Sequence, residues 1–237
     1  KSEIHPALEN ISARLKTENY FNVEPEMLSL LIKYKGVIDT QVPENSEFFR
    51  ARIGFKCKKM PFELSFESQY HYEPYSGSEI SAPPPSLATA GRINRHGVSF
   101  FYAATSSETA IAETRPHPGD IVSVGRFKTK QPLLIADFTE TRIEHFSGSD
   151  QLLDDFLTIH SINVYLNKVV PPCEREHYSV TQLIADTLRQ LGYDGIMFLS
   201  TVGRGYNLVA FHPEQLELID EGGQVFEIQA LNYLIGE

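Results

Sequence analysis

Tryptophan is absent from the sequence and cysteine is nearly so, with only Cys57 and Cys173 among 237 residues. Two cysteines in a chain of this length make no disulfide framework, which excludes the disulfide-rich secreted domains. We interpret both as buried or free thiols, with a single bridge between them as the alternative. No apolar run approaches the roughly 20 residues that span a bilayer, and no basic and apolar leader opens the sequence. We therefore expect a cytoplasmic protein with no membrane partner.

Positive charge is also scarce. The sequence has 21 lysines and arginines but 31 aspartates and glutamates, which gives a formal net charge of -10. Non-specific nucleic-acid binding depends on a positive surface, so we expect no nucleic-acid partner, although a local basic pocket stays compatible with this balance. The eight histidines show no paired ligand spacing, and we predict no metal site.

The sequence divides into a helical N-terminal extension over residues 1–46 and a main domain over residues 47–237. Leu8, Ile11 and Leu15, and then Met27 and Leu31, have helical spacing. Turn residues over positions 39–46 predict a boundary. The main domain mixes strands and helices irregularly, which predicts an α+β fold. We expect strands over residues 48–53, 99–104, 121–127, 132–137, 196–199, 207–211, 216–219 and 225–228, and helices over residues 105–115, 150–167 and 181–191.

Two local patterns refine this prediction. Thr105 and Glu108 have the spacing of a capping box, so a helix should begin there and run to about Arg115. Residues 70–91 are rich in proline and tyrosine and cannot form a regular helix. A long irregular segment inside a compact domain is often a functional loop.

Four side chains stand out by their chemistry and order. Arg92 lies in Gly-Arg-Ile-Asn, Tyr102 follows ten residues later in Phe-Tyr-Ala, Glu113 follows eleven residues after that, and Ser200 comes much later. A cation, an aromatic hydroxyl, a carboxylate and a hydroxyl suit a site that grips a phosphorylated substrate and attacks a ribosyl bond.

This ordered set resembles the RES domain family, which is named for its arginine, glutamate and serine and whose members consume NAD. The resemblance covers roughly residues 48–211 and also includes the motifs at residues 178–182, 192–196 and 207–211. The sequence departs from the family at Ile93, where an aromatic residue is common, in a longer segment over residues 140–170, and in the N-terminal extension. The resemblance implies a fold like that of the ADP-ribosyltransferases, with a split pair of β-sheets enclosing an NAD cleft.

The resemblance also implies roles for the site residues. Nicotinamide leaves NAD as a neutral base, so the usual glycosidase pair of carboxylates is unnecessary and one suffices. Glu113 is our candidate for that carboxylate, and a solvated helix glutamate beside Arg115 is the alternative. Arg92 should bind phosphate through its planar fork, with a surface ion pair as the alternative.

The remaining candidates have supporting roles. Tyr102 is expected to stack on nicotinamide or to donate a hydrogen bond, unless it is only a core aromatic. Ser200 lacks the surroundings of a nucleophile, and we expect it to position ribose or Glu113. Asn207 is expected to support the preceding loop or bind substrate. Arg50 and Arg52 alternate along a strand, and they either face phosphate together or keep a strand edge soluble.

We therefore expect an enzyme that cleaves the nicotinamide–ribose bond of NAD, with water or phosphate as acceptor, and that acts as a growth-inhibiting toxin or defence effector. NAD is then a substrate, and no cofactor is expected. A protein ADP-ribosyltransferase and a non-catalytic nucleotide-binding module are the alternatives. An antitoxin or another regulatory protein is the expected partner.

Overall fold

The computed structural model describes residues 4–59, 71–140, 149–168, 178–219 and 223–231. The helices of this part are α1 (Pro6–Arg14), α2 (Tyr20–Leu31), α3 (Ser107–Glu113), α4 (Asp150–Asn167) and α5 (Ser179–Gln190). The strands are β1 (Asp39–Val42), β2 (Glu47–Ile53), β3 (Cys57–Lys59), β4 (His71–Glu73), β5 (Phe101–Ala104), β6 (Ile121–Thr129), β7 (Leu133–Phe138), β8 (Gly195–Leu199), β9 (Tyr206–Ala210), β10 (Leu216–Leu218) and β11 (Gln224–Glu227). Short 3-10 helices are η1 (Ile32–Tyr34), η2 (Gly77–Glu79), η3 (Pro85–Leu87) and η6 (Pro213–Gln215).

Nine strands form one mixed sheet in the order β1-β7-β8-β9-β5-β2-β6-β10, with β11 also paired to β6. Neighbouring strands are antiparallel except for β7 and β8, which are parallel. The α+β class is therefore confirmed. The sheet has two blocks, because β2 pairs with β5 through the single residue pair Phe49 and Ala104. The separation of the two blocks beside this pair leaves room for a cleft between them.

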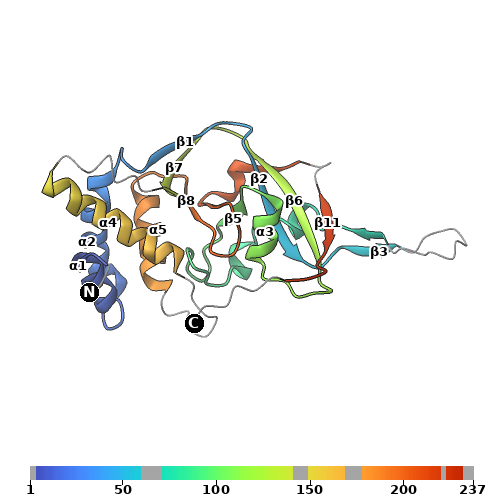
Figure 1. Cartoon of the computed structure of the whole chain (residues 1–237), viewed down its shortest axis with the longest axis horizontal. Helices are drawn as coiled ribbons and strands as arrows, with labels where there is room; N and C mark the ends of the chain where they lie inside the picture. The colour runs from blue at the N-terminus through green and yellow to red at the C-terminus, as the bar shows by residue number, and fades with distance from the viewer. Residues whose placement is uncertain (1–3, 60–70, 141–148, 169–177, 220–222, 232–237) are drawn as a thin grey trace, which may run out of the picture.

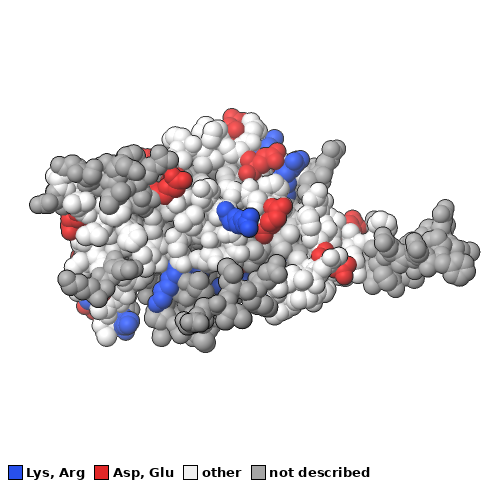
Figure 2. Space-filling model, in the orientation of Figure 1, with Lys and Arg blue, Asp and Glu red and all other residues white. Residues whose placement is uncertain are grey.

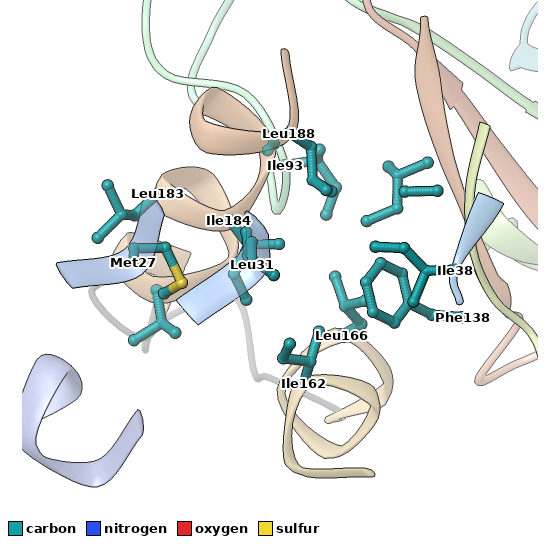
Figure 3. Packing of buried hydrophobic residues seen from close by; sticks show 14 of the residues in the cluster. Met27, Leu31, Ile38, Ile93, Phe138, Ile162, Leu166, Leu183, Ile184 and Leu188 are labelled. Atoms are coloured by element: carbon teal, nitrogen blue, oxygen red, sulfur yellow. The ribbon is translucent and has the colours of Figure 1, made fainter. Parts of the chain in front are cut away.

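Four helices gather at one end of the molecule, and a small hairpin of β3 and β4 lies at the other end (Figure 1). α1, α2, α4 and α5 pack around the larger apolar cluster, where their buried side chains meet Phe138 of β7 and Val209 of β9. Met27 and Leu31 from α2 lie among Leu183 and Ile184 of α5 (Figure 3). The N-terminal helices thus share one core with the sheet, and the division at residue 46 stays a prediction.

The second apolar cluster draws residues from both blocks of the sheet, including Leu133 of β7 and Leu208 of β9. Phe48, Phe101 and Phe127 come from three adjacent strands, and the rings of Phe101 and Phe127 meet edge to face with their centroids 4.6 Å apart. Such aromatic pairs stabilise a core beyond the area that they bury. The two clusters together hold β2, β5 and β9 in place around the junction of the blocks.

The structure corrects two details of the predicted elements. Residues 39–42 form β1, which pairs with β7, where the sequence predicted a turn-rich boundary; the turn begins at Pro43. The capping residue of α3 is Ser106, whose hydroxyl accepts a hydrogen bond from the Thr109 backbone, and not Thr105. The Thr105 hydroxyl accepts a hydrogen bond from the Tyr206 backbone at 3.1 Å, which occupies it in a contact with β9.

The end of α3 also differs from the prediction. The helix ends at Glu113 with Thr114 as its C-cap, because Arg115 adopts a positive φ of 50° and leaves the helical path. Among the described residues, no helix is long and apolar enough to cross a membrane. Cys57 lies on β3, but Cys173 and residues 141–148 and 169–170 of the long segment lie outside the described residues.

Candidate active site at the junction of the two strand blocks

A cleft of about 340 Å³ lies where β2 and β5 separate, a volume within the range of small-molecule sites. Five of the seven predicted site residues line it: Arg50, Arg92, Tyr102, Glu113 and Asn207. They come from β2, a loop before β5, β5 itself, the end of α3 and β9, which are far apart in the sequence. The fold therefore brings most of the predicted set into one cavity.

Glu113 lies at the last residue of α3 and is exposed to the cleft. Its Oε1 accepts hydrogen bonds from the Ser200 hydroxyl at 2.7 Å and from the Asn207 side-chain amide at 2.6 Å. Among the described residues, no donor reaches Oε2 of Glu113. One oxygen therefore fixes the orientation of the carboxylate, and the other is left for a ligand.

The loop after β8 holds Ser200 in place. The Ser200 hydroxyl accepts hydrogen bonds from the backbone N–H groups of Val202 and Gly203, at 3.2 and 2.8 Å. A Cβ atom at Gly203 would lie 2.9 Å from the Thr109 side chain, so the loop can approach α3 this closely only with glycine there. Gly203 is therefore needed for the packing that brings Ser200 beside Glu113.

The loop that carries Arg92 is held by a buried side chain and by hydrogen bonds from α5. Ile93 is fully buried in the larger cluster, beside Leu188 of α5 (Figure 3). The side-chain amide of Gln182, also on α5, donates hydrogen bonds to the carbonyls of Gly91 at 2.8 Å and Asn94 at 3.1 Å. An aliphatic residue at the position where the family often has an aromatic one thus still anchors the loop.

Arg92 itself donates one hydrogen bond, from Nη1 to the carbonyl of Leu166 at 2.8 Å, near the C-terminal end of α4. The hydroxyl of Thr181 donates to the Arg92 carbonyl. The guanidinium has five N–H groups, so most of them are left for an anion in the cleft.

Tyr102 is connected to the same loop through its hydroxyl. It donates to the side-chain carbonyl of Asn94 at 2.7 Å and accepts from the backbone N–H of Ile93 at 3.2 Å. Burial raises the pKa of Tyr102 to about 12, so the hydroxyl is protonated at neutral pH. The hydroxyl is occupied by the loop, and the ring lines the cleft.

The two arginines of β2 have different surroundings. Arg50 lies 5.3 Å from the Phe101 ring and donates from Nη1 to the carbonyl of Tyr102 at 2.8 Å, across the gap between the strand blocks. Burial lowers its pKa to about 10, so it remains charged at neutral pH. Arg52 does not line the cleft; it lies over the Tyr75 ring and donates to the Glu79 carbonyl. β2 pairs with β6 along its length, but on its other side it pairs with β5 only at Phe49, so both roles of these two arginines stay predictions.

The cleft concentrates positive charge in an acidic protein. Arg50, Arg92 and Arg115 line it, and within the described residues none of the three forms an ion pair. Elsewhere Arg95 pairs with Asp186 at 2.6 Å and Arg126 with Glu47 at 3.5 Å. On the face in Figure 2, positive groups near the centre and the upper right lie beside negative ones. Unpaired arginines in a cavity suit an anionic ligand, and bidentate geometry favours phosphate.

Sequence reasoning missed several lining residues, including Phe49, Thr114, Arg115, Tyr178 and Phe198. Tyr178 opens a motif that carried the family resemblance, which was the available signal for it. Phe198 belongs to an apolar stretch that predicts a buried strand, and nothing else in the sequence marks it as a site residue. Among the described residues, no group of three or more histidine, cysteine, aspartate or glutamate side chains is placed to hold a metal ion.

Comparisons with known proteins place the chain in a family. A search of curated proteins found no significant match. Among solved structures, a chain of the M. tuberculosis MbcT–MbcA toxin–antitoxin complex is similar at 13% sequence identity and a TM-score of 0.43, over 84% of this chain and 92% of that one. The model of the RES domain matches residues 61–229, which is more than half of the chain. The chain therefore belongs to the RES domain family, as its ordered arginine, glutamate and serine motifs predicted.

Proposed function

We propose that this protein cleaves the bond between nicotinamide and ribose in NAD. The observation that carries the proposal is the cleft in which Glu113, held by Ser200 and Asn207, lies with arginines that have no carboxylate partner among the described residues. Two further points support NAD cleavage. The family resemblance implies a likeness to the ADP-ribosyltransferases, and the sheet forms two blocks around the cleft.

The chemistry follows from the charge of the substrate. The nicotinamide of NAD is a cationic leaving group, so it takes the bonding electron pair and leaves as a neutral base without a proton. The ribosyl group becomes positively charged as the bond breaks. A fixed carboxylate beside that carbon stabilises this charge, because its orientation needs no rearrangement during the reaction. Glu113 Oε2 is the group we assign to this role.

The arginines have the complementary task of binding the pyrophosphate. Arg50 and Arg92 each use one N–H on a backbone carbonyl and offer the rest to phosphate oxygens. Holding the remote phosphates fixes the reacting bond relative to Glu113, which is how binding energy away from the chemistry contributes to rate. Arg52 stays a predicted substrate-binding residue, although it lies outside the cleft lining.

Unregulated NAD cleavage would deplete a metabolite that every cell requires. We therefore propose that the protein is a growth-inhibiting toxin or defence effector in the cytoplasm, with an antitoxin or another regulatory protein as its partner.

The direct test is nicotinamide release from NAD by wild type and by Glu113→Gln. The variant keeps the shape and the hydrogen-bond geometry, and it should lose about 100-fold or more in kcat while its melting temperature stays close to wild type. Glu108→Gln is the matched control, because this exposed glutamate lies in the first turn of the same helix, outside the cleft lining. Equal turnover by Glu113→Gln would remove Glu113 from the mechanism, and transfer of ADP-ribose to protein would replace cleavage by the transferase alternative.

A further inference from the structure

Thr109 is a buried polar residue in the first half of α3, and it contacts the loop that carries Ser200. Only 1% of its surface is exposed. Its hydroxyl oxygen accepts a hydrogen bond from the backbone N–H of Gly205 at 3.2 Å and another from the Ser106 hydroxyl at 3.0 Å. Buried hydroxyls are normally hydrogen-bonded, and here one partner belongs to a loop 96 residues away in the sequence.

The loop over residues 200–205 lies directly against Thr109. A Cβ atom at Gly203 would lie 2.9 Å from the Thr109 side chain, and one at Gly205 would lie 2.8 Å from the Thr109 hydroxyl oxygen. The Ser200 backbone N–H donates to the Gly205 carbonyl at 3.0 Å, so the two ends of the loop are bonded to each other. The contact between Thr109 and Gly205 therefore restrains the residue to which Ser200 is bonded.

Thr109 and Glu113 lie on the same face of α3. Residues four apart in a helix are neighbours on its surface, so the two side chains are one turn apart. Glu113 contacts the start of the loop through the Ser200 hydroxyl at 2.7 Å, and Thr109 contacts its end through Gly205. One helix face thus holds the loop at two points, and the carboxylate assigned to the chemistry makes one of the two contacts.

We propose that Thr109 is a positioning residue for NAD cleavage, which acts through the loop over residues 200–205 to hold the Ser200 hydroxyl against Glu113. This inference rests on the proposed function and adds a residue to it. Thr109 does not line the cleft, so it acts through Ser200 and not on the substrate. Without its hydroxyl, the Gly205 N–H loses its acceptor and the loop is no longer fixed on α3. Oε1 of Glu113 then loses a well-placed donor.

The effect should appear in kcat and not in KM. Arg50 and Arg92, which are proposed to bind the pyrophosphate, donate hydrogen bonds to the carbonyls of Tyr102 and Leu166, away from this loop. Their binding of substrate should therefore persist. A carboxylate that is free to turn stabilises the developing ribosyl charge less well, and this lowers the rate of the chemical step.

The test compares Thr109→Val with Thr109→Ser, which separates the hydroxyl from the shape of the side chain. Valine keeps the branched shape and removes the hydroxyl, whereas serine keeps the hydroxyl. Nicotinamide release from NAD should show kcat lowered about tenfold in Thr109→Val, the scale expected for a buried donor left without its acceptor. KM for NAD should stay close to that of wild type. Thr109→Ser should retain most of the wild-type kcat.

Thr187→Val is the matched control. Thr187 is a fully buried threonine of α5, and its hydroxyl donates to the Leu183 carbonyl of the same helix at 2.8 Å. The same chemical change is thus made in a buried helix position that has no contact with the loop of Ser200. Thr187→Val should keep the kinetics of wild type, whatever it does to the melting temperature.

A double-mutant cycle with Ser200→Ala distinguishes positioning from a general loss of structure. If Thr109 acts through the Ser200 hydroxyl, Thr109→Val should change kcat by less than about twofold once that hydroxyl is absent, because the two effects are coupled. A residue with a purely structural role would lower kcat by the same factor in both backgrounds.

Three kinetic results would overturn the inference. A wild-type kcat in Thr109→Val would show that the hydroxyl is not needed. Equal losses of kcat with and without the Ser200 hydroxyl would show that Thr109 does not act through it. A raised KM with an unchanged kcat would assign Thr109 to substrate binding.

The loop can also be followed without turnover. Amide hydrogen exchange over residues 200–205 should be faster in Thr109→Val than in wild type or Thr109→Ser, because the loop opens more readily. If wild type releases no nicotinamide, the proposed function fails, and hydrogen exchange decides the role of Thr109 separately. Faster exchange would support its hold on the loop, and unchanged exchange would overturn it.

Discussion

Tyr102 shows how a single hydroxyl connects the cleft to its supporting loop. The hydroxyl contacts Asn94 and the Ile93 backbone, and these two residues directly follow Arg92 in the same loop. Asn94 is buried, and its side-chain amide reaches the carbonyls of Thr89, Arg95 and Val98 at 2.9 to 3.1 Å. The position of the Arg92 guanidinium therefore depends on a small hydrogen-bond network away from the substrate.

Replacing Tyr102 with phenylalanine should destabilise the protein and weaken NAD binding. The variant keeps the ring but leaves a buried N–H and a buried carbonyl oxygen without their partner, which costs about 1–3 kcal/mol. We expect a lower free energy of unfolding and a larger effect on KM for NAD than on kcat. Denaturant unfolding and steady-state kinetics measure both. A phenylalanine variant identical to wild type would mean that the ring alone matters.

At the scale of elements, the N-terminal helices contact the same loop. The Arg95 guanidinium lies 4.0 Å from the centroid of the Tyr20 ring on α2, and its Nε donates to Asp186 on α5 at 2.6 Å. Within the part of the chain that the structure describes, Arg95 Nη2 is buried and has no hydrogen-bond partner. Tyr20 lies before the residues that match the family, so the extension braces a loop of the family domain.

The Tyr20→Leu variant should therefore affect the site from a distance. Losing a cation–π contact of this kind costs about 0.5–2 kcal/mol, and we expect KM for NAD to rise a few-fold with a smaller change in kcat. Tyr20→Phe keeps an aromatic face and should behave as wild type. Steady-state kinetics on both variants test this, and an equal effect of leucine and phenylalanine would show that the ring does not brace the loop.

How much of these elements the sequence predicts depends on how local their causes are. α5 is amphipathic and ends before Gly192, which has a φ of 88°, so periodicity and a C-terminal glycine were sufficient. β1 has only four residues and is stabilised by pairing with β7 almost 100 residues later, which no local pattern reports. The site shows the same difference between local and long-range causes. Motif spacing predicted Glu113, whereas the hydrogen bonds of Gln182 to the Arg92 loop depend on tertiary packing, which no motif reports.

At the scale of the whole molecule, buried tyrosines link stability to alkaline pH. Burial is the main cause that raises the pKa of Tyr34 and of Tyr102 to about 12, and it also raises the pKa of Tyr193. The unfolded chain loses these protons near pH 10, whereas the folded chain keeps them longer. Ionisation therefore favours the unfolded state above pH 10, and the stability contribution is lost between about pH 10 and 12.

We expect the free energy of unfolding to fall over that range. The lowered pKa of Arg50 acts in the opposite direction, because its buried charge destabilises the folded state until the pH exceeds about 10. The three tyrosines outnumber this single arginine, so the net stability should fall. Urea unfolding at intervals between pH 9 and 12 measures the sum. Tyr102→Phe should show a shallower decline than wild type. A wild-type stability that is constant up to pH 12 would contradict this account of the buried tyrosines.

The central claim concerns the whole cleft: three arginines and one oriented carboxylate serve to cleave a bond whose leaving group is already cationic. The measurement that tests it most directly compares NAD with NADH under identical conditions, with products identified by chromatography and mass spectrometry. NADH has the same phosphates and riboses but a neutral dihydronicotinamide, which is a poor leaving group without a proton donor. The account predicts nicotinamide release from NAD and none from NADH. Cleavage of both at similar rates, or cleavage of NAD at its pyrophosphate, would contradict it.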